Sequence, residues 1–291
     1  MSTVVTGATG HLGRLVVEAL LRRGVRPSEI VATGRDTEKI KDLADLGVVV
    51  RRADFADSAS LGAAFAGARK LLLVSTTTVG ERVANHRRAL EAARAAGVSE
   101  VVYTSMSNAD SATMTLAKEH RATERHLRDS GVPFVILRNG WYLENYTEQL
   151  ASVLEHRTVA GSAGEGRVSA ASRADYAEAA AIVLTTEGHL GSVYELGGDK
   201  AFSLTELAAA YSDATGHDIT YAGLPATGFA ELLTGAGLPR EFAEVLADAD
   251  LGLARGELFT DSGDLSRLLG RPTTSLAEAI SSALAARRTA H

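Results

Sequence analysis

The chain contains no cysteine among its 291 residues. Disulfide bonds, thiolate metal sites and cysteine nucleophiles are therefore excluded. Long apolar runs are also lacking: the longest, such as Val132–Leu137 and Ala177–Leu184, fall far short of the roughly 20 residues that a membrane helix needs. The net charge is −6 and no block of basic residues is present, which argues against a nucleic-acid surface.

Several catalytic signatures are absent as well. The sequence has no HExxH zinc motif and no GxSxG nucleophile turn, so no metal site is predicted. An apolar, strand-like run begins at Thr3 and leaves no room for a charged secretory leader. We therefore expect a cytoplasmic protein that does not span a membrane. With 45% hydrophobic and 23% charged residues, an ordinary buried core is expected.

The first half of the chain alternates between two kinds of segment. Val- and Leu-rich runs predict strands at Thr3–Val5, Ile30–Thr33, Val48–Arg51, Leu71–Ser75, Val101–Ser105 and Phe134–Leu137. Segments with helical spacing lie between them, at His11–Arg23, Thr37–Asp45, Ser58–Ala66, Glu81–Ala96 and Ala117–Ser130. Strands without polar alternation, separated by helices, are typical of a parallel sheet covered on both faces. The predicted fold is a doubly wound, Rossmann-like α/β domain.

After about Trp141 this rhythm breaks. "GSAGEGRVSA" is Gly-rich and turn-like, "SRADYAEAAAIVLTTEG" predicts a helix, "SVYELGG" predicts a short strand, and helical segments dominate from Ser203, with a short strand candidate near Ile219–Tyr221. We expect a Rossmann domain over residues 1–140, with residues 172–198 packing back on it. Residues 141–291 then form a smaller, mostly helical lobe, and a ligand cleft is expected at the carboxyl ends of the strands.

The stretch "TGATGHLGR" at Thr6–Arg14 carries three glycines spaced three apart, between a predicted strand and a predicted helix. That context is the one the dinucleotide-binding fingerprint requires. One glycine allows the turn, one lets the backbone approach a pyrophosphate, and one lets the helix lie close to the sheet, while the helix amino terminus attracts phosphate. A tight turn without ligand is the alternative. The expected cofactor contacts are Gly7, Ala8, Thr9, Gly10, His11, Leu12 and Gly13.

The tip of the second strand reads "VATGRD", and it decides between NAD and NADP. An acidic residue there would bind the ribose hydroxyls, whereas this tip carries Arg35, whose guanidinium suits a 2′-phosphate. Asp36 precedes Thr37 and is placed to cap the next helix. The sequence therefore favours NADP, with a solvated surface arginine as the alternative. The same cleft receives Asp54 and Phe55 near the adenine, and Ser75, Thr76, Thr77 and Ser105 near the ribose and nicotinamide.

Six stretches together resemble the NmrA-like family of atypical short-chain dehydrogenase/reductases: "TGATGHLG", "RADF", "LLLVSTT", "EAARAAGVSEVVYTS", "LRNGWYLENY" and "SRADYAEAAA". The likeness covers essentially the whole chain and is strongest toward the family's bacterial NADPH-dependent quinone reductases. It implies NADP(H) binding and hydride transfer to quinones without a flavin. The family also contains members that bind the dinucleotide as redox-sensing regulators with little or no catalysis, which is the main alternative.

The acid–base tyrosine of ordinary short-chain reductases is missing. Aligning "ATERHL" with the usual segment puts Leu116 at the tyrosine and His120 at the lysine, while Lys118 would face about 200° away from His120 on a helix. A quinone is electrophilic and its reduced oxyanion is stabilised by aromaticity, so it suits such a site; another activated carbonyl stays open. His120 is a catalytic candidate that could hydrogen-bond a ribose or a substrate, and a helix-surface histidine is the alternative.

The expected substrate pocket follows the sixth strand. Its residues are Asn139, Gly140, Trp141, Tyr142 and Asn145, among which the aromatic faces suit a flat quinone. The alternative is that Trp141 and Tyr142 only pack the interface between lobes. The stretch "NHRR" at Asn85–Arg88 is interpreted as a solvated helix face. The expected partner is a small-molecule quinone rather than nucleic acid, and the sequence is compatible with a homodimer without fixing the oligomeric state.

Overall fold

The structure, a computed structural model, describes residues 2–76, 78 and 80–289. Its main sheet has seven strands in the order β3-β2-β1-β4-β5-β6-β8, and the pairs from β3 to β6 are parallel. The strands are β1 Ser2–Val5, β2 Ile30–Gly34, β3 Val49–Arg52, β4 Ala68–Leu73, β5 Glu100–Met106, β6 Phe134–Asn139 and β8 Val193–Leu196. The strands predicted in the first half are confirmed.

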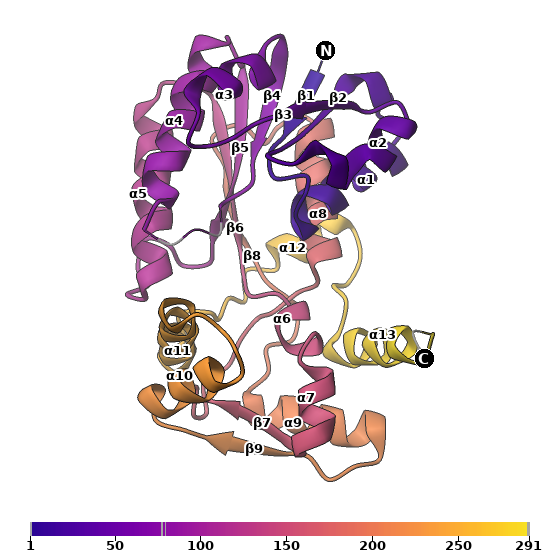
Figure 1. Ribbon diagram of the computed structural model, residues 1–291, viewed down its shortest axis with the longest axis vertical. Helices are drawn as coiled ribbons and strands as arrows, with labels where there is room; N and C mark the ends of the chain where they lie inside the picture. Colours follow the sequence, from indigo (N-terminus) through magenta and orange to yellow (C-terminus); the bar gives the residue numbers. More distant parts are fainter. Residues whose placement is uncertain (1, 77, 79, 290–291) are drawn as a thin grey trace. The chain divides into compact units, whose positions relative to one another are not determined.

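Helices cover both faces of this sheet, as Figure 1 shows: α3, α4 and α5 lie along one face, and α1 packs with α8 on the other. Their bounds are α1 His11–Arg22, α3 Ser58–Phe65, α4 Arg82–Ala95, α5 Thr115–Asp129 and α8 Arg173–Thr185, with a short 3-10 helix η1 at Pro27–Glu29. Because helices bury both faces, strand residues such as Val4, Leu71 and Val101 have no exposed surface. The predicted doubly wound α/β fold is confirmed.

The helix expected over Thr37–Asp45 is divided in two. A 3-10 helix η2 runs over Thr37–Ile40, and the α-helix α2 over Lys41–Asp45. The Asp36 carboxylate accepts the Glu38 N–H at 3.2 Å and so caps η2, as expected from its position before Thr37. The backbone of the strand tip is therefore fixed beside the glycine loop.

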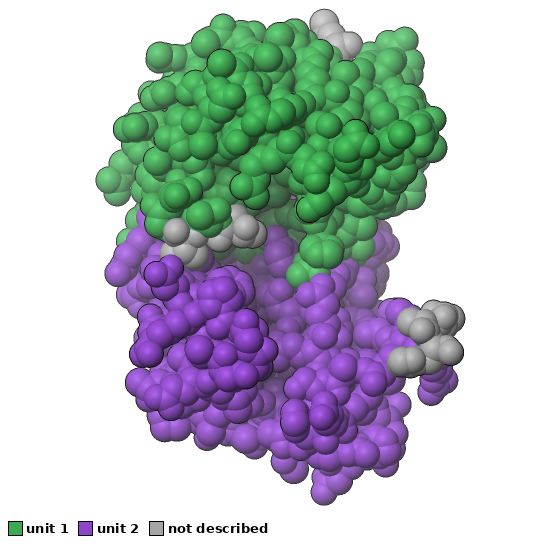
Figure 2. All heavy atoms as spheres, in the orientation of Figure 1, with its two compact units in different colours: residues 1–106, 119–139, 173–194 green, residues 107–118, 140–172, 195–291 purple. Residues whose placement is uncertain are grey.

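The chain forms two compact units (Figure 2). Unit 1 comprises residues 1–106, 119–139 and 173–194, and it contains most of the seven-stranded sheet with its helices. Unit 2 comprises residues 107–118, 140–172 and 195–291. Unit 1 is thus assembled from three separate stretches of sequence.

Unit 2 contains a second, two-stranded parallel sheet that sequence analysis only half found. Strand β9, Thr220–Gly223, was predicted, but its partner β7, Thr158–Gly161, was not. The remaining helices of this unit are α6 Glu144–Thr147, α7 Leu150–His156, α9 Leu204–Thr215, α10 Ala226–Gly235, α11 Arg240–Ala254, α12 Asp264–Leu269 and α13 Leu276–Thr289. In the described part of the chain, no helix has the length and apolarity needed to cross a membrane.

Candidate functional site

The glycine loop is anchored between two strands. After β1, the Thr6 N–H donates to Leu72 O at 3.0 Å and the Ala8 N–H donates to Thr33 O at 2.8 Å. Gly7 has a φ of +64°, the left-handed region in which a side chain is strained. Gly10 then caps α1 without any side-chain hydrogen bond. The first turn of α1 therefore presents its backbone N–H groups, with the positive end of the helix dipole, at the loop tip.

The second and third glycines of this loop, Gly10 and Gly13, have different structural roles. A Cβ on Gly13 would lie 2.4 Å from Gly7 O, so this glycine is required for α1 to pack against the loop's own backbone. A Cβ on Gly10 would meet only Gly7 O, at an ordinary 3.4 Å. Gly10 and His11 are exposed, whereas Leu12 is buried. The packing of the protein does not demand glycine at position 10, which fits a backbone left bare for a phosphate group.

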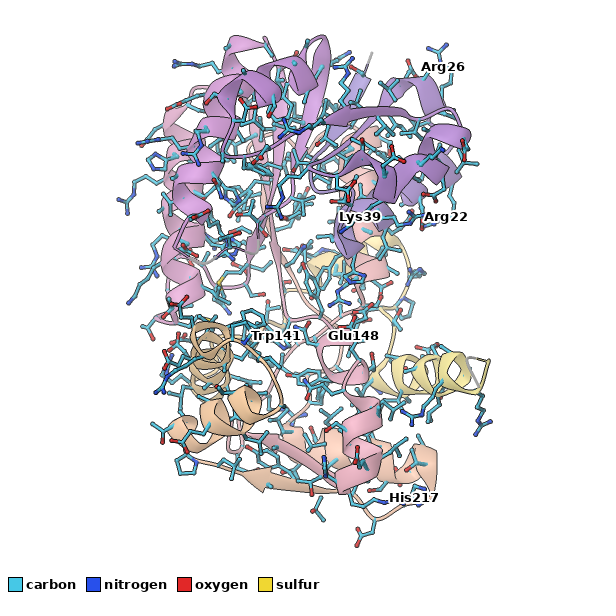
Figure 3. All side chains as sticks on the ribbon, viewed as in Figure 1. Arg22, Arg26, Lys39, Trp141, Glu148 and His217 are labelled. Atoms are coloured by element: carbon cyan, nitrogen blue, oxygen red, sulfur yellow. The ribbon has the colours of Figure 1, made fainter. Side chains whose placement is uncertain are left out.

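Arg35 lies beside this loop because the tip of β2 packs on it. A Cβ on Gly34 would come within 2.4 Å of Thr9 Cγ2, so the strand tip and the loop are in direct contact. The Arg35 side chain that follows is exposed. Lys39, one turn further on in η2, is also exposed and is labelled in Figure 3. The loop and a basic strand tip are thus brought together.

The tips of β3 and β4 carry the next predicted residues. Asp54 accepts the Ala56 N–H at 3.0 Å, and Phe55 offers its carbonyl to Arg88 Nε at 2.7 Å. The Ser75 N–H donates to Thr104 Oγ1 at 2.9 Å. The Thr76 hydroxyl is buried and has no hydrogen-bond partner among the described residues, so it can meet a bound molecule. Thr77 lies outside the described residues.

A buried ionic group lies at the carboxyl ends of β5 and β6. Arg138 donates to both oxygens of Glu124, at 2.9 and 2.8 Å, and the Ser105 hydroxyl donates to the same carboxylate at 2.7 Å. Asn139, the last residue of β6, has a buried Oδ1 without a partner in the described part of the chain. Ser105 is therefore held by a neighbouring carboxylate, whereas the Asn139 carbonyl oxygen is available.

His120 lies in the interior of unit 1. Its Nδ1 is 2.7 Å from the hydroxyl of Tyr103, and its side chain is 6% exposed. Burial, reinforced by the charge of Arg82, holds the pKa of His120 well below its ordinary value, so the ring is neutral. The alternative interpretation as a helix-surface histidine is wrong. Lys118 is exposed, so the two side chains point in different directions, as the helical angle predicts.

The predicted substrate residues after Asn139 belong to unit 2. Gly140 donates its N–H to Leu196 O at 2.7 Å, and Trp141 O accepts the Ala171 N–H at 3.1 Å. The Asn145 N–H donates to Tyr142 O at 3.1 Å. Trp141, labelled in Figure 3, and Tyr142 are both only half-buried.

The interpretation of "NHRR" as a solvated face is wrong. His86 is fully buried, Asn85 is 6% exposed, and Arg88 is held by hydrogen bonds to Phe55 O and Asn85 Oδ1. Four consecutive polar residues in a helix point in different directions, so they cannot all lie on the solvated face. The signal that could have found them is the spacing of Arg82, His86 and Ala89, which places them along one side of α4.

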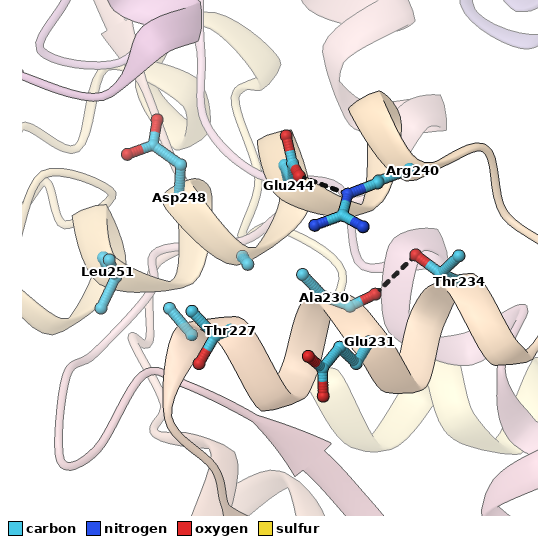
Figure 4. A pocket seen from close by; sticks show the side chains of 10 residues that line it. Thr227, Ala230, Glu231, Thr234, Arg240, Glu244, Asp248 and Leu251 are labelled. Atoms are coloured by element: carbon cyan, nitrogen blue, oxygen red, sulfur yellow. Dashed lines mark hydrogen bonds and ion pairs between the residues drawn. The ribbon is translucent and has the colours of Figure 1, made fainter.

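Two hollows stand out in the described part of the chain, and neither is lined by a predicted site residue. One, of about 710 Å³, lies in unit 1 at the amino ends of the strands and includes Ser2, Lys70 and Glu100. The other, of about 430 Å³, lies in unit 2 between α10 and α11 (Figure 4). The first lies at the edge of the sheet opposite the glycine loop.

Comparison with known proteins gives consistent matches. The sequence model of the NmrA-like family matches residues 2–270. Quinone oxidoreductase 2 of Escherichia coli is 48% identical over 277 residues, which are 95% of this chain and 96% of that protein.

Solved structures agree with the sequence matches. The E. coli NADPH-dependent quinone oxidoreductase in complex with NADPH has a TM-score of 0.94 and 47% identity, over 98% of this chain and 100% of that one. The Citrobacter triphenylmethane reductase complexed with NADP(H) has a TM-score of 0.93 and 36% identity, over 97% and 100%. Family match, relatives and fold agree along nearly the whole length, and the chain belongs to the NmrA-like family.

Proposed function

We propose that this protein is an NADPH-dependent reductase of quinones that works by direct hydride transfer, without flavin or metal. The observation that carries the proposal is the 48% identity with the E. coli quinone oxidoreductase over 95% of the chain. The loop geometry supports it, because Gly10 leaves backbone bare at the amino terminus of α1. We assign cofactor binding to the Rossmann domain, residues 1–140 with 172–198, and acceptor binding to residues 141–291.

The residues around the loop fit NADPH in a consistent order. The loop residues Gly7 to Gly13 would hold the pyrophosphate and Arg35 the 2′-phosphate, while Asp54 and Phe55 flank the adenine. Thr76 would meet the nicotinamide ribose, since its buried hydroxyl has no partner among the described residues. Ser105 is held nearby by Glu124. When bound, the nicotinamide supplies the hydride.

The chain's own residues leave the protonation step to water. Leu116 stands where ordinary short-chain reductases have their tyrosine, and His120 is neutral and bound to Tyr103 in the interior. A quinone needs little help from an acid, because its reduced oxygen is stabilised by aromaticity. We propose that Trp141 and Tyr142, together with Asn139, Gly140 and Asn145, line the quinone. The partial exposure of the aromatic residues Trp141 and Tyr142 supports this assignment.

The decisive experiment measures NADPH oxidation by the purified protein against a small panel of quinones, with flavin content read from the absorbance spectrum. Turnover without bound flavin is expected. Gly10→Val is the control: it should abolish NADPH binding in a calorimetric titration while the fold is retained, since a Cβ there meets no close neighbour. Tight NADP(H) binding without any turnover would instead favour a redox-sensing regulator.

Arg35 sets the preference between the two cofactors in this proposal. Guanidinium–phosphate bonds contribute roughly 1.5–3 kcal/mol each, so Arg35→Ala should weaken NADPH binding about 10- to 100-fold and leave NADH unchanged. Lys39 could share the phosphate, so the double variant should lose more than either single one. Equal changes in the dissociation constants of NADPH and NADH would show that Arg35 does not bind the 2′-phosphate.

We also place the reaction in the cytoplasm, where reduced nicotinamide cofactors are available, and we propose a homodimer. Exposed large apolar side chains in unit 2 support self-association: Leu232, Phe242, Leu251 and Phe259. Light scattering of the purified protein at several concentrations tests this, and a mass of one chain throughout would contradict it.

A further inference from the structure

Helix α4 turns a basic face toward the interior of unit 1. Arg82 is 4% exposed and His86 is fully buried, although both are polar. Buried polar side chains are costly unless each finds hydrogen-bond partners. Arg82 and His86 bind backbone groups at one strand tip, and Arg88, on another side of the helix, binds a backbone group at a second one.

The protonation state of His86 follows from its contacts. Its Nε2 accepts the backbone N–H of Thr76 at 3.1 Å, and its Nδ1 is 3.0 Å from Thr123 Oγ1. The Thr123 hydroxyl already donates to the carbonyl of Glu119, so its oxygen accepts from Nδ1–H. The ring is therefore neutral, with its proton on Nδ1. Burial, with the charge of Arg82, lowers the pKa of His86 to about 3, in agreement with a neutral ring.

Arg82 holds the other side of the same peptide segment. Its Nε donates to Thr76 O at 2.8 Å, and its guanidinium forms an ion pair with Glu119. Glu119 Oε1 in turn accepts the Gly80 N–H at 2.8 Å. Both backbone polar groups of Thr76 are thus bound by side chains of α4. This holds the backbone from which the Thr76 side chain projects.

Arg88 lies two residues after His86, on another side of α4, and reaches the neighbouring strand tip. Its Nε donates to Phe55 O at 2.7 Å, and its Nη2 donates to Asn85 Oδ1 at 2.6 Å. One helix therefore fixes the backbone after β4 through His86 and the backbone after β3 through Arg88. The residues fixed in this way, Phe55 and Thr76, are those assigned above to the two ends of the dinucleotide.

We propose that His86 and Arg88 are positioning residues for the cofactor: His86 orients the Thr76 segment toward the nicotinamide half, and Arg88 orients the Phe55 segment toward the adenosine half. Neither side chain is assigned a contact with the cofactor itself. This inference rests on the proposed function, and it assigns different halves of the cofactor to two residues of α4. A purely structural role predicts instead that both halves of the cofactor are affected alike.

Two substitutions of His86 separate its hydrogen bonds. In His86→Gln the amide oxygen can take the place of Nε2 and still accept the Thr76 N–H. In His86→Asn the shorter amide can replace only the Nδ1 side and leaves the Thr76 N–H without its acceptor. Dissociation constants are measured by calorimetry for NADPH and for 2′,5′-ADP, which represents the adenosine half. The melting temperature of each variant is recorded as well.

His86→Asn should weaken NADPH roughly three- to tenfold, the range for one neutral hydrogen bond, and change 2′,5′-ADP less than about twofold. His86→Gln should restore NADPH affinity. Arg88→Met should weaken both ligands by the same factor, since it acts on the adenosine end. Thr123→Val is the matched control, because it removes the hydroxyl that binds Nδ1 and the Glu119 carbonyl but leaves the Nε2 bond to Thr76. It should lower the melting temperature and keep the ratio of the two affinities.

The inference is overturned if His86→Asn weakens both ligands equally or neither, or if His86→Gln behaves like His86→Asn. Should His86→Asn fail to fold, Arg88→Met decides when reduced nicotinamide mononucleotide is added as a probe of the other half. Arg88→Met must weaken 2′,5′-ADP and leave the mononucleotide unchanged, whereas equal losses for both probes would overturn the inference. A wild-type protein that binds neither ligand would refute the proposed function first, and this inference with it.

Discussion

The two units bury ionisable groups in opposite ways. In unit 1 they come in sets with defined partners: Glu124 with Arg138, and His86 with Thr76 and Thr123. In unit 2 the partly buried Asp250 has its Oδ2 bound by the Ser162 N–H at 2.7 Å. Among the described residues, buried side-chain oxygens without a partner occur in both units: those of Tyr146 and Ser162 in unit 2, and those of Thr76 and Asn139 in unit 1.

This difference indicates which role the buried polar groups have in each unit. In unit 1 the bound ionisable side chains fix strand tips, and hydrogen-bonded sets of this kind favour one conformation. In unit 2 the carboxylate ties α11 to the end of β7 and carries an electrostatic cost, since burial raises the pKa of Asp250 to about 6. Acid should therefore weaken unit 1 and strengthen unit 2. The following predictions test this contrast.

The largest effect is expected from Glu124→Gln. This carboxylate is 4% exposed and binds Arg138 through both oxygens, so neutralising it leaves a buried guanidinium without its counter-charge. The free energy of unfolding should fall by about 3–5 kcal/mol. The control is Glu244→Gln in unit 2, whose pair with Arg240 is mostly exposed and should contribute less than about 1 kcal/mol. Urea unfolding measures both, and similar losses would contradict the contrast.

Acidification should destabilise unit 1 strongly. His86 and His120 stay neutral in the folded chain but bind a proton in the unfolded chain below about pH 6.5. The unfolded state then holds more protons, so stability is lost as the pH falls from 6.5 toward the folded pKa values. The slope is about 1.4 kcal/mol per pH unit for each histidine. The loss of stability can be followed by hydrogen exchange of peptides from β4 and α4 at pH 7, 6 and 5. Unchanged protection of these peptides would refute the prediction.

Asp250→Asn should act in the opposite direction, on unit 2. Because the folded pKa of Asp250 is raised to about 6, its carboxyl keeps a proton between pH 4 and 6 that the unfolded chain releases, and stability falls as the pH rises through that window. The amide has no charge to bury and still accepts the Ser162 N–H. We expect a gain of about 1–2 kcal/mol at pH 7 that vanishes near pH 4. Trp141, the single tryptophan, lies in unit 2 and reports its unfolding.

The smallest effects come from two tyrosine hydroxyls. Tyr103→Phe removes the partner of His120 Nδ1 and should cost about 1–2 kcal/mol. Tyr146→Phe removes a hydroxyl that binds no other described residue, so its cost should be below about 0.5 kcal/mol. Thermal unfolding of Tyr103→Phe and Tyr146→Phe compares the two losses of stability. A larger loss for Tyr146→Phe would show that its hydroxyl has a partner after all.

The sequence predicted unit 1 well because its signals are local. Six Val- and Leu-rich runs and three spaced glycines are each visible within about ten residues, and each corresponds to an element of the structure. Strand β7 was missed because Thr158–Gly161 is short, lies next to a Gly-rich turn, and owes its conformation to β9, more than fifty residues away. No local pattern encodes that pairing.

The candidate site was predicted as residue types at strand tips, and its supporting layer was not. Arg35 and Gly10 could be proposed as cofactor contacts because a loop and a strand end place them in the sequence. His86 was overlooked because its role depends on Thr76 and Thr123, which approach it only in the folded chain. The burial of His120 depends likewise on Tyr103, a residue of another element. Contacts of this kind require the structure.

The three-part composition of unit 1 has a consequence for its synthesis on the ribosome. Residues 1–139 supply β1 to β6, but α8, which packs with α1, belongs to residues 173–194. At about 5–20 residues per second, this last stretch is complete roughly 3–11 s after β6 has been made. During that interval the apolar side of α1 has no covering helix. The newly made sheet must therefore wait, with one face covered by α1 but not by α8, for a segment that follows a stretch of unit 2.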